Sequence, residues 1–160
     1  MTGNELFSDA FSGTLLVSID PGVDYYAWAE WRDGRLIGAG LATFADAPTT
    51  AQTAIIEKPQ VYAETKSKGV RSSDIVNLSI AVGRLVERFH SVELVLPGTW
   101  KGQLPKKIHH ERILAQLTSG ERGLLEGMKQ KELVHVLDAV GLGLYYLNRV
   151  GKRTQGETGT

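Results

Sequence analysis

Apolar residues in the first part of the chain follow the spacing of β-strands. Residues 14–20 (TLLVSID) form an apolar run of strand length, and residues 25–32 (YYAWAEWR) are rich in aromatic side chains. Asp33 and Gly34 supply a tight hairpin turn before residues 35–44. The three segments are therefore predicted to pair as an antiparallel meander.

Two shorter apolar segments end close to prolines. Residues 53–57 (TAIIE) end two positions before Pro59, and residues 92–96 (VELVL) end at Pro97. Short apolar runs of this kind are typical of buried parallel strands. We therefore expect two parallel strands to extend the sheet.

Helical spacing appears between and after these two segments. Apolar positions in residues 75–90 recur with a helical period behind a Ser-Ser-Asp cap at 72–74, which predicts a crossover helix. Pro105 opens a second helix, to about residue 117, and residues 129–150 form a third that is apolar nearly all round and thus buried. The order of elements predicts an α/β domain with a mixed five-stranded sheet flanked by helices.

The length of 160 residues fits one domain, predicted at residues 13–150. Residues 1–12 read as an N-terminal extension without the features of a secretory signal, and residues 151–160 lack apolar side chains and are predicted to be a disordered tail. No apolar run approaches the roughly 18 residues of a membrane span. We therefore expect a cytoplasmic protein with no membrane partner.

The amino-acid composition limits the kinds of active site and of partner that the chain can have. The chain has no cysteine, which excludes disulfides, thiolate metal sites and cysteine nucleophiles. Its formal net charge of zero argues against a nucleic-acid partner, but basic residues outnumber acidic ones ten to five between positions 58 and 112. That uneven distribution is compatible with binding DNA through one face.

Three carboxylates stand where apolar residues are the rule: Asp20 and Glu57 at the ends of core strands, and Asp138 inside the apolar helix. Three buried, unpaired carboxylates would repel one another, and each would cost several kcal/mol. Divalent cations remove both problems, since hard ions such as Mg²⁺ take oxygen ligands, and a pair of them about 4 Å apart suits phosphodiester hydrolysis.

His135 precedes Asp138 by three positions, so both side chains lie on one helix face and can share a site. Histidine can ligate metal or transfer a proton near neutral pH. Each residue alone also has an ordinary structural explanation: Asp20 as a turn former, Glu57 as a solvated strand end and His135 as a hydrogen-bonded core histidine. The combination favours a shared acidic site.

Three motifs resemble those of RuvC-type Holliday-junction resolvases, members of the RNase H-like superfamily. The first is the strand of Asp20 with its hairpin (LLVSIDPGVDYYAWAEW), the second ends at Glu57 (AIIEKPQVY), and the third carries His135 and Asp138 (HVLDAVGLGLYYL). The segment LPGTWKGQLPKKIHHERI is similar to phage-type members, with Lys101 at the position of the family's lysine. The resemblance covers residues 15–147.

This resemblance implies an RNase H-like fold, a homodimer, and paired hydrolytic nicks in a four-way (Holliday) DNA junction. It also implies two Mg²⁺ ions per active site, with Mn²⁺ as a substitute: Asp20 and Glu57 hold one, Asp20 and Asp138 the other, assisted by His135. Two features depart from the family. The connection at residues 45–52 is shorter than the helix of most relatives, and usual resolvases are basic.

The resemblance places Tyr62 where the family has an aromatic residue that stacks on junction bases, and Lys66, Lys68 and Arg71 follow it in a polar loop suited to phosphates. Strand-end packing of Tyr62 and a solvated loop are the alternatives.

A second basic stretch holds Trp100, Lys101, Lys106 and Lys107, which we also expect to bind DNA. Burial of Trp100 in the core is the alternative. The neighbouring histidines at 109 and 110 diverge by about 100° on a helix and are assigned no catalytic role.

The sequence therefore predicts a metal-dependent junction endonuclease. The enzyme alternatives are a less selective flap or debranching nuclease and an ATP-binding fragment of the sugar-kinase and actin type, for whose second lobe the chain has no room. The non-enzyme alternative is a catalytically inactive DNA-binding module on the same fold.

Overall fold

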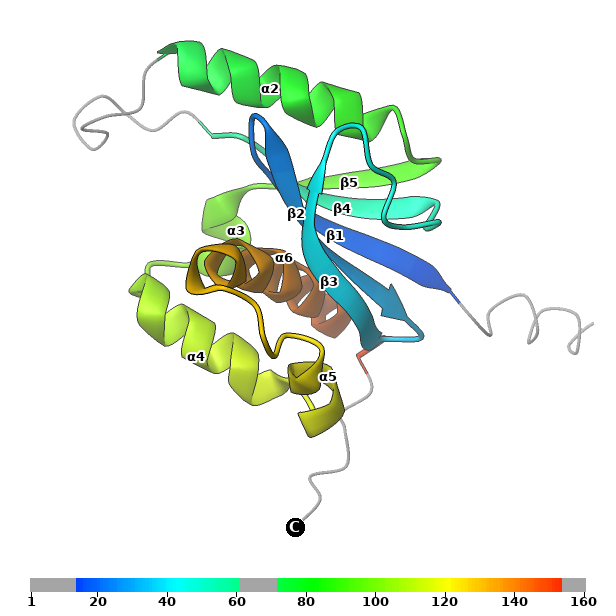
Figure 1. Ribbon diagram of the computed structural model, residues 1–160, viewed down its shortest axis with the longest axis vertical. Helices are drawn as coiled ribbons and strands as arrows, with labels where there is room; N and C mark the ends of the chain where they lie inside the picture. Colours follow the sequence, from blue (N-terminus) through cyan, green and yellow to red (C-terminus); the bar gives the residue numbers. More distant parts are fainter. Residues whose placement is uncertain (1–13, 61–71, 154–160) are drawn as a thin grey trace, which may run out of the picture.

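A five-stranded mixed sheet divides the molecule into two layers of helices. The computed structural model describes residues 14–60 and 72–153 (Figure 1). The strand order is β3-β2-β1-β4-β5. The strands are β1 (Leu15–Pro21), β2 (Tyr25–Arg32), β3 (Arg35–Thr43), β4 (Thr53–Glu57) and β5 (Ser91–Val95). Among the described residues, no helix is long and apolar enough to cross a membrane.

The strand pairing confirms the predicted meander and the predicted parallel pair. Strand β1 runs antiparallel to β2, and β2 antiparallel to β3, through a turn at which Asp33 and Gly34 have positive φ angles of 51° and 77°. Strands β1, β4 and β5 run parallel. The β3–β4 connection contains no helix, as the short sequence at 45–52 indicates.

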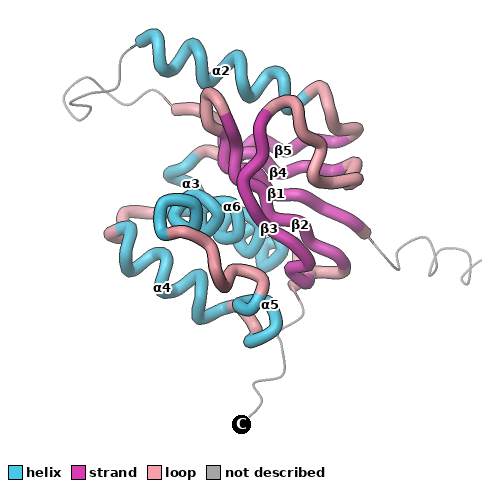
Figure 2. The backbone as a smooth tube through the Cα atoms, in the orientation of Figure 1, coloured by secondary structure: helices cyan, strands magenta, loops and turns pink. Residues whose placement is uncertain are grey.

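Two core clusters occupy the two faces of the sheet. One lies beneath α2 (Ser72–Val86), whose Val82 and Leu85 pack with Val17, Ile19 and Ile56. The other lies beneath α3 (Pro97–Lys101), α4 (Lys106–Gln116), α5 (Ser119–Gly123) and α6 (Gln130–Arg149). Figure 2 shows the strands between these two helical layers.

The helices differ from the predicted ones in two ways. Helix α2 begins inside the predicted cap and ends at Val86 rather than His90, where Arg88 turns away and donates to the carbonyls of Phe44 and Asp46. The short helices α3 and α5 were not predicted. The signal for α5 is a capping box between Thr118 and Glu121.

Helix α6 packs directly on β1 and β2. Its middle is buried, from Val136 to Leu144, while Lys131 and Glu132 near its start are exposed. The buried Ser18 hydroxyl donates to the Ala139 carbonyl at 2.7 Å and accepts the Trp31 indole N–H at 3.0 Å. These two bonds join strands β1 and β2 to the helix in the turn that carries Asp138.

Two glycines allow this close approach. A Cβ on Gly143 would lie 2.3 Å from Trp31 Nε1 and 2.6 Å from Ser18 Oγ, and a Cβ on Gly141 would lie 2.5 Å from Ile113 Cδ1. The neighbours of Gly143 cannot yield easily, because Trp31 and Ser18 are fully buried. Gly143 therefore sets the distance between α6 and the sheet, and Gly141 sets the distance between α6 and α4.

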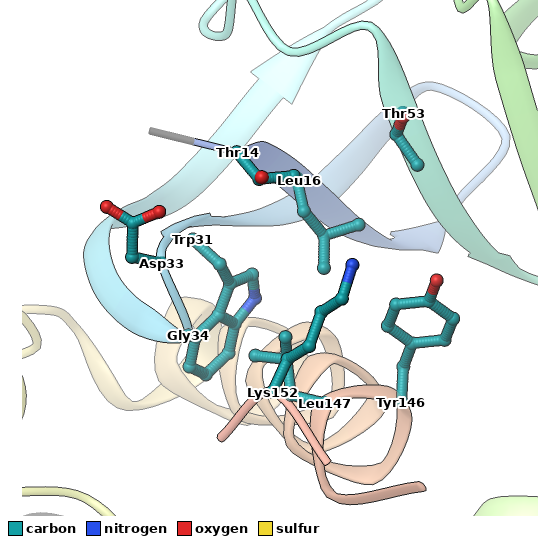
Figure 3. A pocket seen from close by; sticks show the side chains of 9 residues that line it. All are labelled: Thr14, Leu16, Trp31, Asp33, Gly34, Thr53, Tyr146, Leu147 and Lys152. Atoms are coloured by element: carbon teal, nitrogen blue, oxygen red, sulfur yellow. The ribbon is translucent and has the colours of Figure 1, made fainter. Parts of the chain in front are cut away.

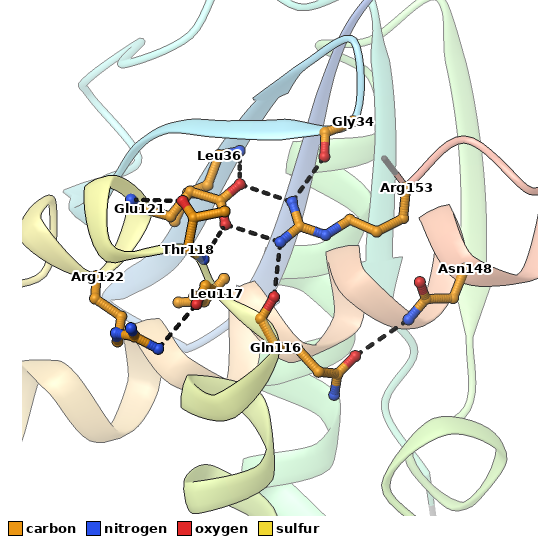
Figure 4. Close-up of polar contacts among 9 residues, drawn as sticks. All are labelled: Gly34, Leu36, Gln116, Leu117, Thr118, Glu121, Arg122, Asn148 and Arg153. Atoms are coloured by element: carbon orange, nitrogen blue, oxygen red, sulfur yellow. Dashed lines mark hydrogen bonds and ion pairs between the residues drawn. The ribbon is translucent and has the colours of Figure 1, made fainter. Parts of the chain in front are cut away.

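The domain extends beyond the predicted boundary at 150. Arg153, assigned to the disordered tail, forms a buried ion pair with Glu121 at 2.7 Å and donates to the Gly34 carbonyl (Figure 4). Burial raises the pKa of Glu121, but the Arg153 guanidinium and the backbone N–H groups of Thr118 and Leu36 outweigh it and lower that pKa to about 2. Arg153 thus joins α5 to the turn between β2 and β3.

Substituting the packed and the open glycine should have opposite effects. Gly143→Ala is expected to lower the free energy of unfolding by about 1–3 kcal/mol through overpacking. Gly83→Ala, in α2 with nothing within 4 Å of its Cβ, should raise it by up to about 1 kcal/mol. Urea denaturation measures both. Equal effects at the two positions would show that α6 can move away from the sheet freely.

The Glu121–Arg153 pair predicts a pH dependence of stability. Because the pKa of Glu121 is lower in the folded state, its contribution of about 3 kcal/mol is complete above its unfolded pKa near 4.5 and is lost as pH falls towards 2. The difference in unfolding free energy between wild type and Glu121→Gln should thus shrink by about half from pH 6 to pH 3. A difference independent of pH would contradict this assignment.

Candidate active site

The site begins at the carboxyl ends of β1 and β4. Ile19 is aligned with Ile56 in the parallel ladder, so Asp20 and Glu57 follow at the same level of the sheet. Since Ile19 and Ile56 pack on the α2 side and side chains alternate along a strand, both carboxylates point to the α6 side. Their side chains are each 14% exposed.

Helix α6 supplies the opposite wall. His135 is close to Asp20, with 3.8 Å between Nδ1 and Oδ2, and its side chain is half exposed. The Asp20 carboxylate raises the pKa of His135, and this effect exceeds the lowering caused by partial burial. Tyr25 meets the imidazole edge-on, with 6.1 Å between ring centroids.

Glu57 is paired from the α3 side. Lys101 Nζ lies 2.9 Å from Oε2 and 3.2 Å from Oε1, and the Trp100 indole N–H donates to Oε2 at 2.9 Å. Burial raises the pKa of Glu57, and the neighbouring Asp20 carboxylate adds to this, whereas Lys101 acts in the opposite direction. The carboxylate is thus partly desolvated and compensated by one lysine.

Asp138 is paired from the α4 side. His110 Nε2 lies 2.9 Å from Oδ1, and Lys106 Nζ lies 3.5 Å from Oδ2. The Asp138 side chain is 8% exposed, so these contacts satisfy a carboxylate that would otherwise be buried without a partner.

The donor set suits a hard divalent cation, because three carboxylates and one imidazole offer oxygen and nitrogen ligands. Within residues 14–60 and 72–153, however, no three histidine, aspartate or glutamate side chains are grouped so that they could hold a metal ion together. Lys101 and Lys106 instead pair with Glu57 and Asp138, and His110 shares a hydrogen bond with Asp138. The ligand types fit the predicted metal, but the described carboxylates are not grouped around one point as a shared metal site would need.

A hollow of about 240 Å³ opens beside Asp20, lined in part by Gly22, Asp24, Tyr25 and His135. Val23 and Tyr25 expose nearly half of their surface there. The acidic site is therefore accessible from outside on the side of the β1–β2 turn.

A separate cavity of about 420 Å³ lies at the other end of β1 (Figure 3). It is lined by Thr14, Leu16, Trp31, Asp33, Gly34, Thr53, Tyr146, Leu147 and Lys152. None of the four predicted catalytic residues contributes to it.

Comparison with known proteins identifies solved structures with a similar fold. No protein-family model and no curated protein sequence matches this chain. Among solved structures, Thermus thermophilus RuvC in complex with a Holliday junction substrate aligns with a TM-score of 0.56 and 15% identity over 86% of this chain and 97% of RuvC. The chain has the RuvC-type, RNase H-like fold.

Two further structures have this RuvC-type fold in common with the chain. Thermus thermophilus RuvC in another structure gives a TM-score of 0.51 at 14% identity, over 86% of this chain and 97% of that one. The yeast mitochondrial Holliday junction resolvase Ydc2 gives 0.52 at 10% identity, over 94% of this chain and 88% of that one. The predicted fold class is confirmed.

The structure describes only some of the predicted DNA-binding residues. Tyr62, Lys66, Lys68 and Arg71 lie outside the described residues. Trp100 is only 9% exposed and belongs to the core cluster, so the core alternative is the one observed and stacking on a base is not open to it here.

The lysines of the second basic stretch differ in whether they contact an acid of the site. Lys101 pairs with Glu57 and the exposed Lys106 pairs with Asp138, whereas Lys107, also exposed, pairs with neither. These contacts were not predicted, because the lysines and the acids lie in separate segments of the sequence.

His110 contacts the site although the sequence assigned it no catalytic role. Adjacent histidines do diverge on a helix and form no metal pair, but this leaves one of them free to face the site. His109 turns to the ring of Trp100, with 5.2 Å between centroids, which leaves His110 directed at Asp138. The feature of the sequence that could have predicted this contact is the basic stretch that precedes the buried acid.

Removing the imidazole of His110 tests how much the buried Asp138 depends on this contact. His110→Ala is expected to lower the free energy of unfolding by about 1–3 kcal/mol, because the buried Asp138 loses its nearest donor. His90→Ala, an exposed histidine after α2, should change it by less than about 0.5 kcal/mol. Chemical denaturation of both variants checks this, and an unaffected His110→Ala would mean that Lys106 alone satisfies Asp138.

Proposed function

We propose that this chain is a divalent-metal-dependent endonuclease that cleaves four-way DNA junctions. The observation that carries the proposal is the position of Asp20 and Glu57 at the ends of adjacent parallel strands, facing His135 and Asp138 on α6. This arrangement stands on a RuvC-type fold, of which a member has been solved in complex with a Holliday junction substrate.

Asp20, Glu57, His135 and Asp138 would hold the metal, with two Mg²⁺ ions per site and Mn²⁺ as a substitute. When bound, Mg²⁺ supplies an activated water and charge stabilisation for phosphodiester hydrolysis. The hard oxygen donors and the absence of cysteine from the chain support this choice of ion.

The chain's own residues supply proton handling and phosphate binding. His135 is half exposed beside Asp20, whose carboxylate raises the pKa of the imidazole, so Nδ1 or Nε2 can give or take a proton at the open side of the site. Lys107, with the sequence-predicted Tyr62, Lys66, Lys68 and Arg71, would contact the DNA.

Selectivity for a branched substrate must come from the shape of the DNA, because every phosphodiester offers the metal site the same chemistry. Because a four-way junction has approximate two-fold symmetry, a homodimer with an isologous interface would present one site to each of two opposing strands and make paired nicks.

We place this activity in the cytoplasm, in accord with a chain in which no described helix could span a membrane.

Replacing one acid should separate binding from catalysis. Asp20→Asn is expected to reduce the rate of junction cleavage more than about 1000-fold, since several kcal/mol of metal-dependent stabilisation are lost. Junction binding should be unchanged or tighter, because a negative charge near phosphate is removed. Gel assays of cleavage and fluorescence anisotropy of binding measure the two quantities.

The control for this variant is Glu126→Gln, which removes an exposed carboxylate between α5 and α6. It should cleave at the wild-type rate. If Asp20→Asn cleaved at a comparable rate, Asp20 would be a turn residue and the proposed site would be wrong.

A further inference from the structure

Lys101 occupies the place of a counter-ion in the acidic site. Its ammonium lies within 3.2 Å of both oxygens of Glu57, and the ring of Trp100 lies beneath it, with 5.0 Å between Nζ and the centroid. The Lys101 side chain is 29% exposed and that of Glu57 14%, so the contact is partly withdrawn from water. A contact of this kind is worth more than an exposed surface pair.

The remaining carboxylates act on the same ammonium. Burial lowers the pKa of Lys101, but Glu57, Asp138 and Asp20 together outweigh burial and raise it. One lysine thus lies within the field of all three acids. Lys106, by comparison, is 58% exposed, and its ammonium lies 3.5 Å from Asp138.

This arrangement conflicts with simultaneous binding of a divalent cation at Glu57. Two cations at one carboxylate repel each other, and Glu57 already has the Lys101 ammonium at one side and the Trp100 indole N–H on Oε2. An ammonium displaced from Glu57 needs another anion, because leaving it unpaired in a partly buried position is costly. Phosphate oxygens of DNA are the anions that the proposed function brings to this place.

We infer that Lys101 competes with the divalent cation for Glu57 and transfers to a DNA phosphate when the cation binds. The inference rests on the proposed function for the identity of the substrate. It makes Lys101 a positioning residue that couples the two ligands: metal binding frees a DNA contact, and DNA binding removes a competitor of the metal. By linkage, each ligand must then raise the affinity for the other by the same factor.

The first test measures metal affinity without DNA. In titrations with Mn²⁺ followed by electron paramagnetic resonance, Lys101→Met should bind Mn²⁺ about tenfold more tightly than wild type, the factor expected for loss of one partly buried ion pair. Lys107→Met, which removes an exposed lysine of α4, should differ from wild type by less than about twofold. Unchanged or weaker Mn²⁺ binding by Lys101→Met would overturn the inference.

High salt distinguishes direct competition from a general charge effect. At 1 M NaCl the screening length is about 3 Å, so long-range repulsion of the metal by a lysine disappears while contact competition at Glu57 persists. The difference between Lys101→Met and wild type should therefore remain. Its loss in high salt would reduce Lys101 to one charge among many. Should Lys101→Met fail to fold by circular dichroism, Lys101→Gln provides the same loss of charge with a polar side chain.

The second test measures coupling. Wild type should bind a fluorescent four-way junction about tenfold more tightly in Ca²⁺ than in EDTA, and Lys101→Met should lose most of this enhancement. Equal enhancement in both proteins would contradict the transfer to phosphate.

The outcomes separate the two proposals. Tighter Mn²⁺ binding by Lys101→Met with no junction cleavage by wild type in Mg²⁺ would refute the nuclease function and retain the competition. Cleavage by wild type with no effect of Lys101→Met on Mn²⁺ affinity would refute the competition alone.

Discussion

The close contact between α6 and the sheet is the constraint on which the site depends. Ser18 and Trp31 fix the helix through the Ala139 carbonyl, and Gly143 removes the Cβ that would hold it away. Asp138 precedes Ala139 by one residue, and Asp20 follows Ser18 by two, so the same contact sets the distance between the acids of helix and strand. A shift of the helix by the size of a methyl group would change every distance across the site.

The second constraint is electrostatic. Bringing Asp20, Glu57 and Asp138 to one edge of the sheet concentrates negative charge in a partly buried place, and the chain compensates with the ammonium groups of Lys101 in α3 and Lys106 in α4. The two helices that carry these cations surround the acidic edge and follow each other directly in the sequence. The layer opposite α2 therefore has two roles: it covers the sheet, and it supplies the positive charge that allows the acids to stay together.

The sequence predicted all five strands and three helices to within a few residues, because apolar periodicity and turn residues are local signals. It also pointed to Asp20, Glu57, His135 and Asp138, since carboxylates at apolar positions stand out without a structure. It could not foresee the contacts of Lys101, Lys106 and His110 with the acids, because those contacts join α3 and α4 to β4 and α6, and no periodicity encodes them. Arg153 was missed for the same reason: a polar tail residue becomes buried only once Glu121 is brought to it.

Incubation of the wild-type protein with a labelled four-way junction, and with a linear duplex of the same sequence, tests the central claim most directly. In Mg²⁺ we expect nicks in two opposing strands of the junction close to the branch point and none in the linear duplex, and in EDTA we expect binding without cleavage. Junction binding without cleavage in Mg²⁺ and in Mn²⁺ would contradict the account and leave a DNA-binding module on a RuvC-type fold.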